Sequence, residues 1–189
     1  MGYRTNTRVV PGLSPTIVLD GDWLKTGALI KDLPRLILLG SGKGQRSGAE
    51  KLKKIVKKYI RQGKAPPGVH WPEFSNDYKR LMKWRGGNPE SFYYQTGLYY
   101  RSIKVWHNAT KTVYYVGVEK GKKRPGTKVT IAKIARLLEM GSAHLHIQAR
   151  PLWKPAYKAS KGSRKIKSLI IWHIRKEIYN AYGVRARVY

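Results

Sequence analysis

The sequence predicts an α+β fold: a small antiparallel β-sheet flanked by helices, with an extended N-terminal arm. Residues 47–62, 130–140 and 163–182 carry apolar side chains at helical spacing, which predicts three helices. Residues 99–107 and 112–118 are rich in aromatic and β-branched side chains and are joined by Asn-Ala-Thr-Lys, which favours a β-hairpin. With 189 residues and 41% hydrophobic content, the chain has enough apolar side chains for a core. We expect an arm over residues 1–19 and one domain over residues 20–189.

The first elements are assigned from their boundary residues. Two prolines and little periodicity predict the extended arm. Asp20 or Asp22 is a candidate cap for a helix over residues 23–31. Pro34 interrupts that pattern and suits the first position of a short second turn, which Gly40 ends.

Residues 47–62 form the clearest predicted helix. Ser47 is the expected N-cap, and Glu50 three residues later completes a capping box. Gly63 is placed to end the helix. The apolar stripe consists of Ala49, Leu52, Val56, Tyr59 and Ile60.

The remaining elements follow in order along the chain. Residues 64–90 contain four prolines and predict a long loop with one short helical turn near residues 76–83. The predicted hairpin follows, then a basic loop tip over residues 120–126 and the helix over residues 130–140. A proline-bearing turn leads to the C-terminal helix over residues 163–182. The inward side chains of that helix are expected to be Ile166, Leu169, Ile170, His173, Ile174 and Ile178.

The net charge of +29 is the strongest compositional feature. Such a chain requires a source of negative charge nearby: nucleic acid, an acidic protein surface or an anionic membrane. A solvated helix face is the alternative role for the helical lysines. The candidate contacts to DNA or another partner are Lys51, Lys54, Lys57 and Lys58 in the helix, and Lys120, Lys122, Lys123 and Arg124 in the basic loop.

The stretch LILLGSGKGQRSG, residues 36–48, resembles a phosphate-binding loop only superficially. That loop requires a glycine five residues before Gly42, where this chain has Ile37, and a hydroxyl side chain after Lys43, where it has Gly44. We therefore expect a flexible connector between two helices.

Little in the sequence indicates catalysis. The ten carboxylates are scattered, and without cysteine the chain has neither a thiol nucleophile nor a thiolate metal site. His144 and His146 present two imidazoles without further ligands nearby. The apolar runs are too short to span a bilayer, and the first residues lack the apolar block of a signal peptide. We expect no enzyme activity, no cofactor, no metal and no membrane partner.

Three motifs in order suggest a family. TGLYYRSI, residues 96–103, resembles the T-G-x-L-x-x-S-I signature of the neck and tail-completion proteins of tailed bacteriophages, and VYYVGV resembles the strand that follows there. IARLLEMGSAHLHIQARPLWKPA, residues 134–156, resembles the Y-A-x-x-x-E-x-G-T and A-R-P-F-L-x-P-A region of that family. WPEFSNDYKRLMKW is similar to an upstream stretch of the virion morphogenesis branch, mainly at Trp71 and Ser75. Ser142 and the pair Leu152-Trp153 depart from the family pattern.

The resemblance implies a non-enzymatic virion protein that assembles in the host cytoplasm. Such proteins form homo-oligomeric rings, commonly hexameric, at the head–tail junction as neck, tail-completion or tail-terminator proteins. The implied partners are portal-side connector proteins, tail-tube or terminator proteins, and the genomic DNA in the channel, contacted without sequence specificity. The subunit-interface candidates are Thr96, Gly97, Glu139, Gly141, Arg150, Pro151 and Trp153. A stand-alone basic nucleic-acid-binding protein is the alternative.

Overall fold

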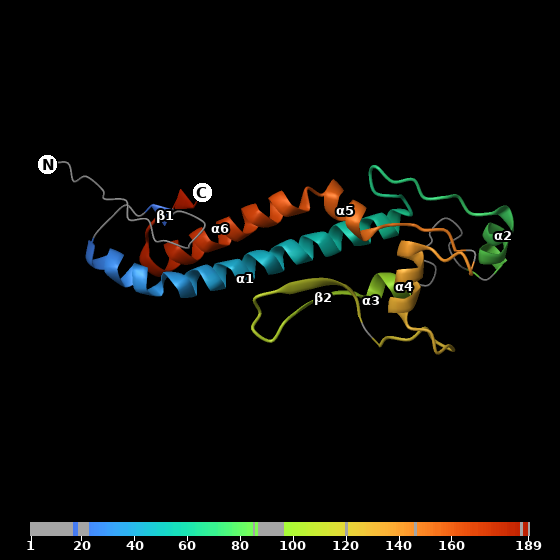
Figure 1. Ribbon diagram of the computed structural model, residues 1–189, viewed down its shortest axis with the longest axis horizontal. Coiled ribbons are helices and arrows are strands. Elements are labelled where there is room, and N and C mark those ends of the chain that lie inside the picture. The colour runs from blue at the N-terminus through green and yellow to red at the C-terminus, as the bar shows by residue number, and fades with distance from the viewer. Residues whose placement is uncertain are drawn as a thin grey trace. The chain divides into compact units, whose positions relative to one another are not determined.

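The computed structural model describes residues 17–18, 23–84, 86, 97–119, 121–145, 147–185 and 187–188. The α+β prediction is confirmed, with helices predominating (Figure 1). The helices are α1 (Trp23–Gln62), α2 (Asn76–Trp84), α3 (Leu98–Ser102), α4 (Ile131–Met140), α5 (Trp153–Ala159) and α6 (Gly162–Tyr182). The strands are β1 (Ile17–Val18), β2 (Ile103–His107), β3 (Tyr114–Val118) and β4 (Arg187–Val188).

The chain divides into two compact units. Unit 1 consists of Met1–Gly48, His107–Tyr114 and Arg164–Tyr189, and unit 2 consists of Ala49–Trp106 and Tyr115–Ser163. The prediction of one domain over residues 20–189 stays a prediction beside this division. Of the predicted arm, only β1 belongs to the described residues, where it pairs antiparallel with β4.

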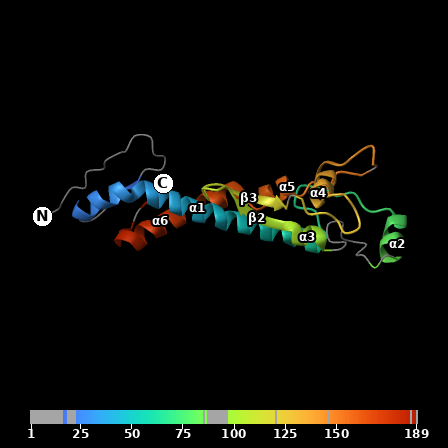
Figure 2. The ribbon, with the colours of Figure 1, turned by 90° about the horizontal axis from the view of Figure 1, so that it is seen from below.

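Unit 1 is built on two antiparallel helices that lie side by side, the first part of α1 and α6 (Figures 1 and 2). Three glycines spaced four residues apart, Gly40, Gly44 and Gly48, lie on one face of α1. A Cβ atom at Gly44 would stand 2.4 Å from the Cα of Ile170, and one at Gly40 would stand 2.5 Å from the Cα of Ile174. The absence of side chains at these glycines therefore allows the two backbones to approach closely.

The prediction of a flexible connector over residues 36–48 was wrong, because this stretch is helical throughout. Three glycines cost a helix roughly 3 kcal/mol relative to alanine when considered alone. Here α6 packs directly on them, and that tertiary packing overrides the local preference. The predicted capping box was also wrong: Ser47 lies inside α1, where its Oγ is 3.0 Å from His173 Nε2.

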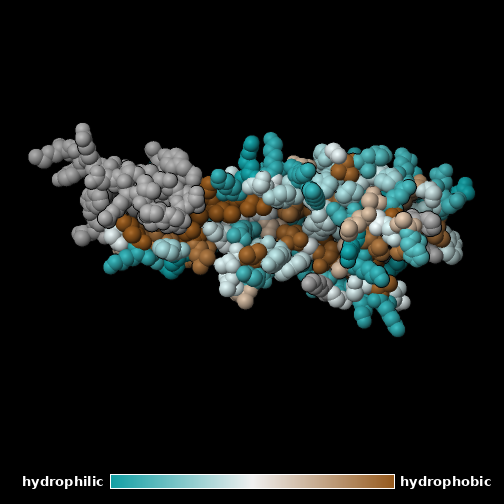
Figure 3. Space-filling model, viewed as in Figure 1, coloured by the Kyte–Doolittle hydropathy of each residue, from teal (hydrophilic) through white to brown (hydrophobic). Residues whose placement is uncertain are grey.

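The predicted interruption at Pro34 was also wrong, because Pro34 lies inside α1. Proline removes one helical N–H and crowds the preceding turn, at a cost of about 3 kcal/mol. Apolar packing on both sides of it stabilises the continuous helix. The buried cluster consists of Leu29, Leu33, Leu36, Ile174 and Ile178. Further apolar residues of this helix pair remain at the surface, as the brown areas along α1 and α6 in Figure 3 show.

Unit 2 has its own core, which α4 and the last turns of α1 help to form. The predicted helix over residues 130–140 is confirmed, and the Thr130 side chain accepts a hydrogen bond from the Lys133 N–H as its N-cap. The predicted stripe on α1 is confirmed at Val56 and Ile60, which are fully buried. The buried cluster consists of Val56, Ile60, Tyr99, Ile103, Ile131, Leu138, Leu152 and Ala156.

The predicted hairpin is confirmed, because β2 pairs with β3. The strand β2 covers the second half of the predicted strand over residues 99–107. The strand prediction was wrong for residues 99–102, which belong to helix α3. Gly97 starts this turn with φ of 66°, and the Ser102 hydroxyl donates to the Tyr99 carbonyl at 2.6 Å. Tyr99 is buried in the core of unit 2, so tertiary packing decides against its strand preference.

Candidate polyanion-binding site

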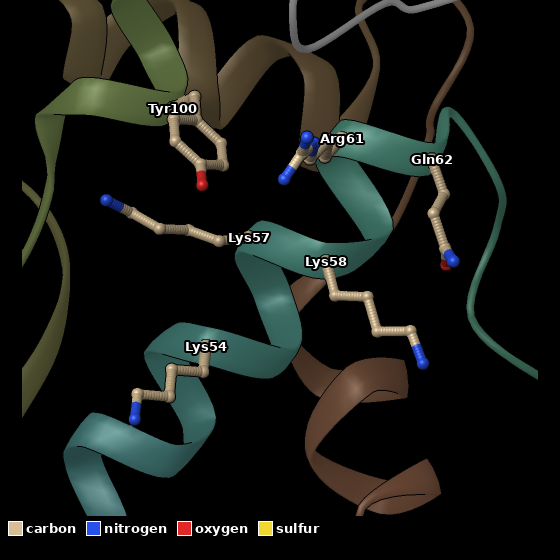
Figure 4. A pocket seen from close by; sticks show the side chains of 6 residues that line it. All are labelled: Lys54, Lys57, Lys58, Arg61, Gln62 and Tyr100. Carbon is tan, nitrogen blue, oxygen red and sulfur yellow. The ribbon is translucent and has the colours of Figure 1, made fainter.

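The last two turns of α1 and the helix α3 form a hollow of about 560 Å³ in unit 2. The residues that line it are Lys54, Lys57, Lys58, Arg61, Gln62 and Tyr100. Figure 4 shows Lys57 extending toward Tyr100, with Lys54 before it and Arg61 after it along α1. Among the described residues, no carboxylate lines this hollow.

The hollow brings four positive charges close together. The ammonium of Lys57 lies 4.6 Å from the centre of the Tyr100 ring, a cation–π contact. Burial lowers the pKa of Lys57, and the positive charge of the neighbouring Lys53 lowers it further. Glu50, the nearby acid of α1, pairs with Lys53 at 2.6 Å. Within the described residues, no carboxylate forms an ion pair with the four cations of the hollow.

Three of these cations, Lys54, Lys57 and Lys58, are predicted contact residues that the structure brings together. Lys51 is exposed and does not line the hollow. Sequence reasoning missed Arg61 and Tyr100 as site residues. The spacing of seven residues from Lys54 indicates that Arg61 shares its helix face, whereas Tyr100 comes from a distant segment that no local pattern connects to α1.

The predicted contacts in the basic loop lie elsewhere in unit 2. Lys123 forms an isolated β-bridge with Thr130, and the Arg124 N–H donates to the Val129 carbonyl at 3.0 Å. The side chains of Lys123 and Arg124 are exposed, and Lys122 is half-buried. Lys120 lies outside the described residues.

Four residues from the segments that carry the family resemblance form a second group with their partners, which we call the brace: Trp71, Glu139, Arg150 and Trp153. Glu139 of α4 accepts hydrogen bonds from the main-chain N–H groups of Leu152, at 2.9 Å, and Trp153, at 3.1 Å. These donors start α5, where a negative charge also interacts favourably with the helix dipole. Burial raises the pKa of Glu139, while its hydrogen bonds from Leu152, Trp153 and Lys154 lower it.

Arg150 occupies the buried centre of the brace, with 5% of its surface exposed. Its guanidinium donates to the Pro72 carbonyl at 2.8 Å and lies 5.1 Å from the centre of the Phe74 ring. The contacts with Pro72 and Phe74 indicate that Arg150 fastens the loop before α2 to the segment that leads into α5.

Two tryptophans complete the brace. The Trp71 indole donates to the Pro151 carbonyl at 3.0 Å, and the Trp153 indole donates to the Tyr99 hydroxyl at 3.2 Å. Burial is the main cause that raises the pKa of Tyr99. These bonds join segments that lie 80 and 54 residues apart in the sequence.

The interface candidates among the described residues therefore have contacts within the chain, and their role between subunits stays a prediction. Gly141 has φ of 75°, and a Cβ there would stand 2.8 Å from the Ala149 nitrogen. Gly97 is buried, and Pro151 and Trp153 are half-buried. Thr96 lies outside the described residues.

The Ser47–His173 pair in unit 1 has the residue types of a nucleophile and its base. Their 3.0 Å contact lies between two packed helices, and Glu177, one turn after His173, binds Lys43 at 2.7 Å. Ser47 is in mid-helix, where main-chain N–H groups bond within the helix and offer no oxyanion hole. The pair therefore supports packing of the helices and does not indicate acyl transfer.

The described part of the chain holds no group of three or more His, Cys, Asp or Glu side chains placed to bind a metal ion. His146 lies outside the described residues, so the predicted pairing of imidazoles is not described. Among the described helices, none combines the length and the apolar character that crossing a bilayer requires. No family model, curated protein or solved structure matches this chain.

Proposed function

We propose that this chain is a structural virion protein of a tailed phage. It forms a homo-oligomeric ring at the head–tail junction, connects head to tail and surrounds the DNA channel. The brace carries this proposal: segments that resemble the neck and tail-completion family, far apart in the sequence, are bonded to one another. Residues that bond to one another account for why such motifs occur together in one chain.

The charge supports the same function. A ring of chains that each carry +29 repels itself unless anionic surroundings compensate it. DNA inside the channel supplies that compensation, and contacts to its phosphates require no particular base sequence. The partners in this proposal are further copies of the chain, portal-side and tail-side proteins, and genomic DNA.

The test is mass spectrometry of purified phage particles together with deletion of the gene. We expect the chain in the particles at a stoichiometry of several copies, and separate heads and tails after deletion. Deleted particles that still join heads to tails would refute the assembly role. Replacing Lys120, Lys122, Lys123 and Arg124 with Gln is expected to impair DNA retention or ring docking, and normal genome content in those particles would exclude this role for the loop.

A stand-alone basic nucleic-acid-binding protein is the second candidate, favoured by the cations of the hollow. In that case the chain binds nucleic acid as a monomer with steep salt dependence and is absent from purified particles. Native mass measurement of the free chain and of its nucleic-acid complex separates the two candidates, because only the first requires a closed oligomer.

A further inference from the structure

We infer that the hollow formed by Lys54, Lys57, Lys58, Arg61 and Tyr100 binds the phosphodiester backbone of nucleic acid. The inference rests on the proposed function for its setting, a particle that contains DNA. It adds a defined site, with Arg61 and Tyr100 as members and Lys51 outside it. The same site serves the second candidate function.

The spacing of the cations fits a line of phosphates. Lys54, Lys57, Lys58 and Arg61 occupy positions i, i+3, i+4 and i+7 of α1, so they lie on one helix face. From Lys54 to Arg61 the helix rises about 10 Å. Successive phosphates of one DNA strand advance about 3.4 Å along the duplex axis. The row is therefore long enough to follow about three phosphates.

The chemistry of the hollow favours the backbone over the bases. Tyr100 is the aromatic residue among those lining it, and Lys57 already lies over its ring, so a stacking base would have to displace that contact. Arg61 offers a planar fork that matches phosphate geometry. Gln62, a neutral hydrogen-bond donor and acceptor, lines the same hollow. These groups recognise phosphate without reading sequence.

The electrostatics also favour a partner with dense, regular charge. Burial and a neighbouring cation disfavour the charged form of Lys57 in the free chain, and an anion in the hollow relieves that cost. An acidic protein helix also offers carboxylates, but protein interfaces usually bury an apolar centre as well. The described residues that line this hollow are four cations, one glutamine and one tyrosine that a lysine already contacts, which favours nucleic acid.

The experiment measures binding of the full-length chain to fluorescent 20-nucleotide DNA, duplex and single-stranded, by anisotropy across a salt series. One variant replaces Lys54, Lys57, Lys58 and Arg61 with Gln. The matched control changes the same charge at exposed positions outside the hollow: Lys158, Arg164, Lys165 and Lys167 to Gln. Each phosphate contact with duplex DNA contributes about 0.9 to the slope of log K against log salt. The row follows about three phosphates, so we expect the hollow variant to reduce the slope for the duplex by about 2.7. Its affinity should fall roughly tenfold or more relative to the control.

A second measurement uses the unchanged chain and so does not depend on how a variant folds. Bound DNA should protect Lys54, Lys57 and Lys58 from acetylation more than Lys158, Lys165 and Lys167, as read by peptide mass spectrometry. Equal affinity losses in the two variants, or equal protection of the two lysine sets, would overturn the site. A polyglutamate competitor that displaces DNA as well as unlabelled DNA does would overturn the assignment to nucleic acid. Neither measurement requires a ring, so failure of the site is distinguishable from failure of the assembly role.

Discussion

Replacing Gly44 with alanine tests whether the helix pair of unit 1 depends on backbone contact. The new Cβ would stand 2.4 Å from the Cα of Ile170 and 2.8 Å from its nitrogen. Non-bonded carbon atoms reach favourable contact at about 3.5 Å, so the two helix backbones must separate by about 1 Å. Because the opposing atoms belong to a helix backbone, no side-chain rotation removes the clash.

The expected magnitude follows from two opposing terms. Alanine raises helix propensity by about 1 kcal/mol over glycine. Overpacking of this kind costs about 1–3 kcal/mol, with the upper part of that range appropriate to a backbone clash. We expect a net loss of about 1–2 kcal/mol, or a fall in Tm of roughly 2–8 °C for a chain of this size.

Gly27 provides the matched control, because it lies in the same helix and nothing stands within 4 Å of a Cβ built there. Gly27→Ala should gain about 1 kcal/mol from propensity and raise Tm by roughly 2–4 °C. Both variants are measured by thermal and urea unfolding followed by circular dichroism. If Gly44→Ala stabilises the chain as much as Gly27→Ala does, the reasoning about close backbone approach is wrong.

Three further predictions concern the brace and one loop. Glu139→Gln should change the pH dependence of stability: since burial raises the folded pKa, the wild-type chain binds more protons when folded and loses stability as pH rises from about 4.5 through that pKa. The variant should lack this component, and parallel urea titrations of both chains at several pH values would expose a mistaken sign. Gly141→Ala should destabilise more than Gly126→Ala, because both have positive φ but only the former meets main-chain atoms; equal Tm shifts would contradict this. Arg150→Ala should cost about 1–3 kcal/mol by leaving the carbonyl of the half-buried Pro72 without its donor, and Arg150→Lys should cost less; an unchanged Tm for the alanine variant would show that the hydrogen bond does not stabilise the fold.

Local sequence patterns predicted helices well where the packing face and the propensities agree. The helix α4 lies where the pattern predicts it, and Ile131 and Leu138 of its apolar face are buried. The patterns were wrong around Pro34 and Gly44, because the energy that keeps α1 continuous there comes from α6, which lies far away in the sequence. The assignment of Tyr99 to a strand was also wrong. An aromatic residue suits either a strand or a buried helical turn, and tertiary contacts decide between them.

The candidate sites were predictable to a similar degree. The row of lysines on α1 follows directly from helical spacing, but the hollow requires Tyr100, which folding brings to that face. The motif residues Glu139 and Arg150 were expected to act between subunits. Their bonds to the start of α5 and to the Pro72 carbonyl require three-dimensional knowledge of where those main-chain groups lie.

The buried position of Arg150 affects how genetic screens of this chain should be interpreted. A substitution there that abolishes activity in a genetic screen reports first on how much folded protein accumulates in the cell, because cellular quality control removes destabilised chains. Variants at Arg150 or Glu139 therefore require a measurement of abundance before any defect is attributed to assembly. Exposed positions such as Lys58 escape this ambiguity, so they are the better targets for genetic dissection of partner contacts.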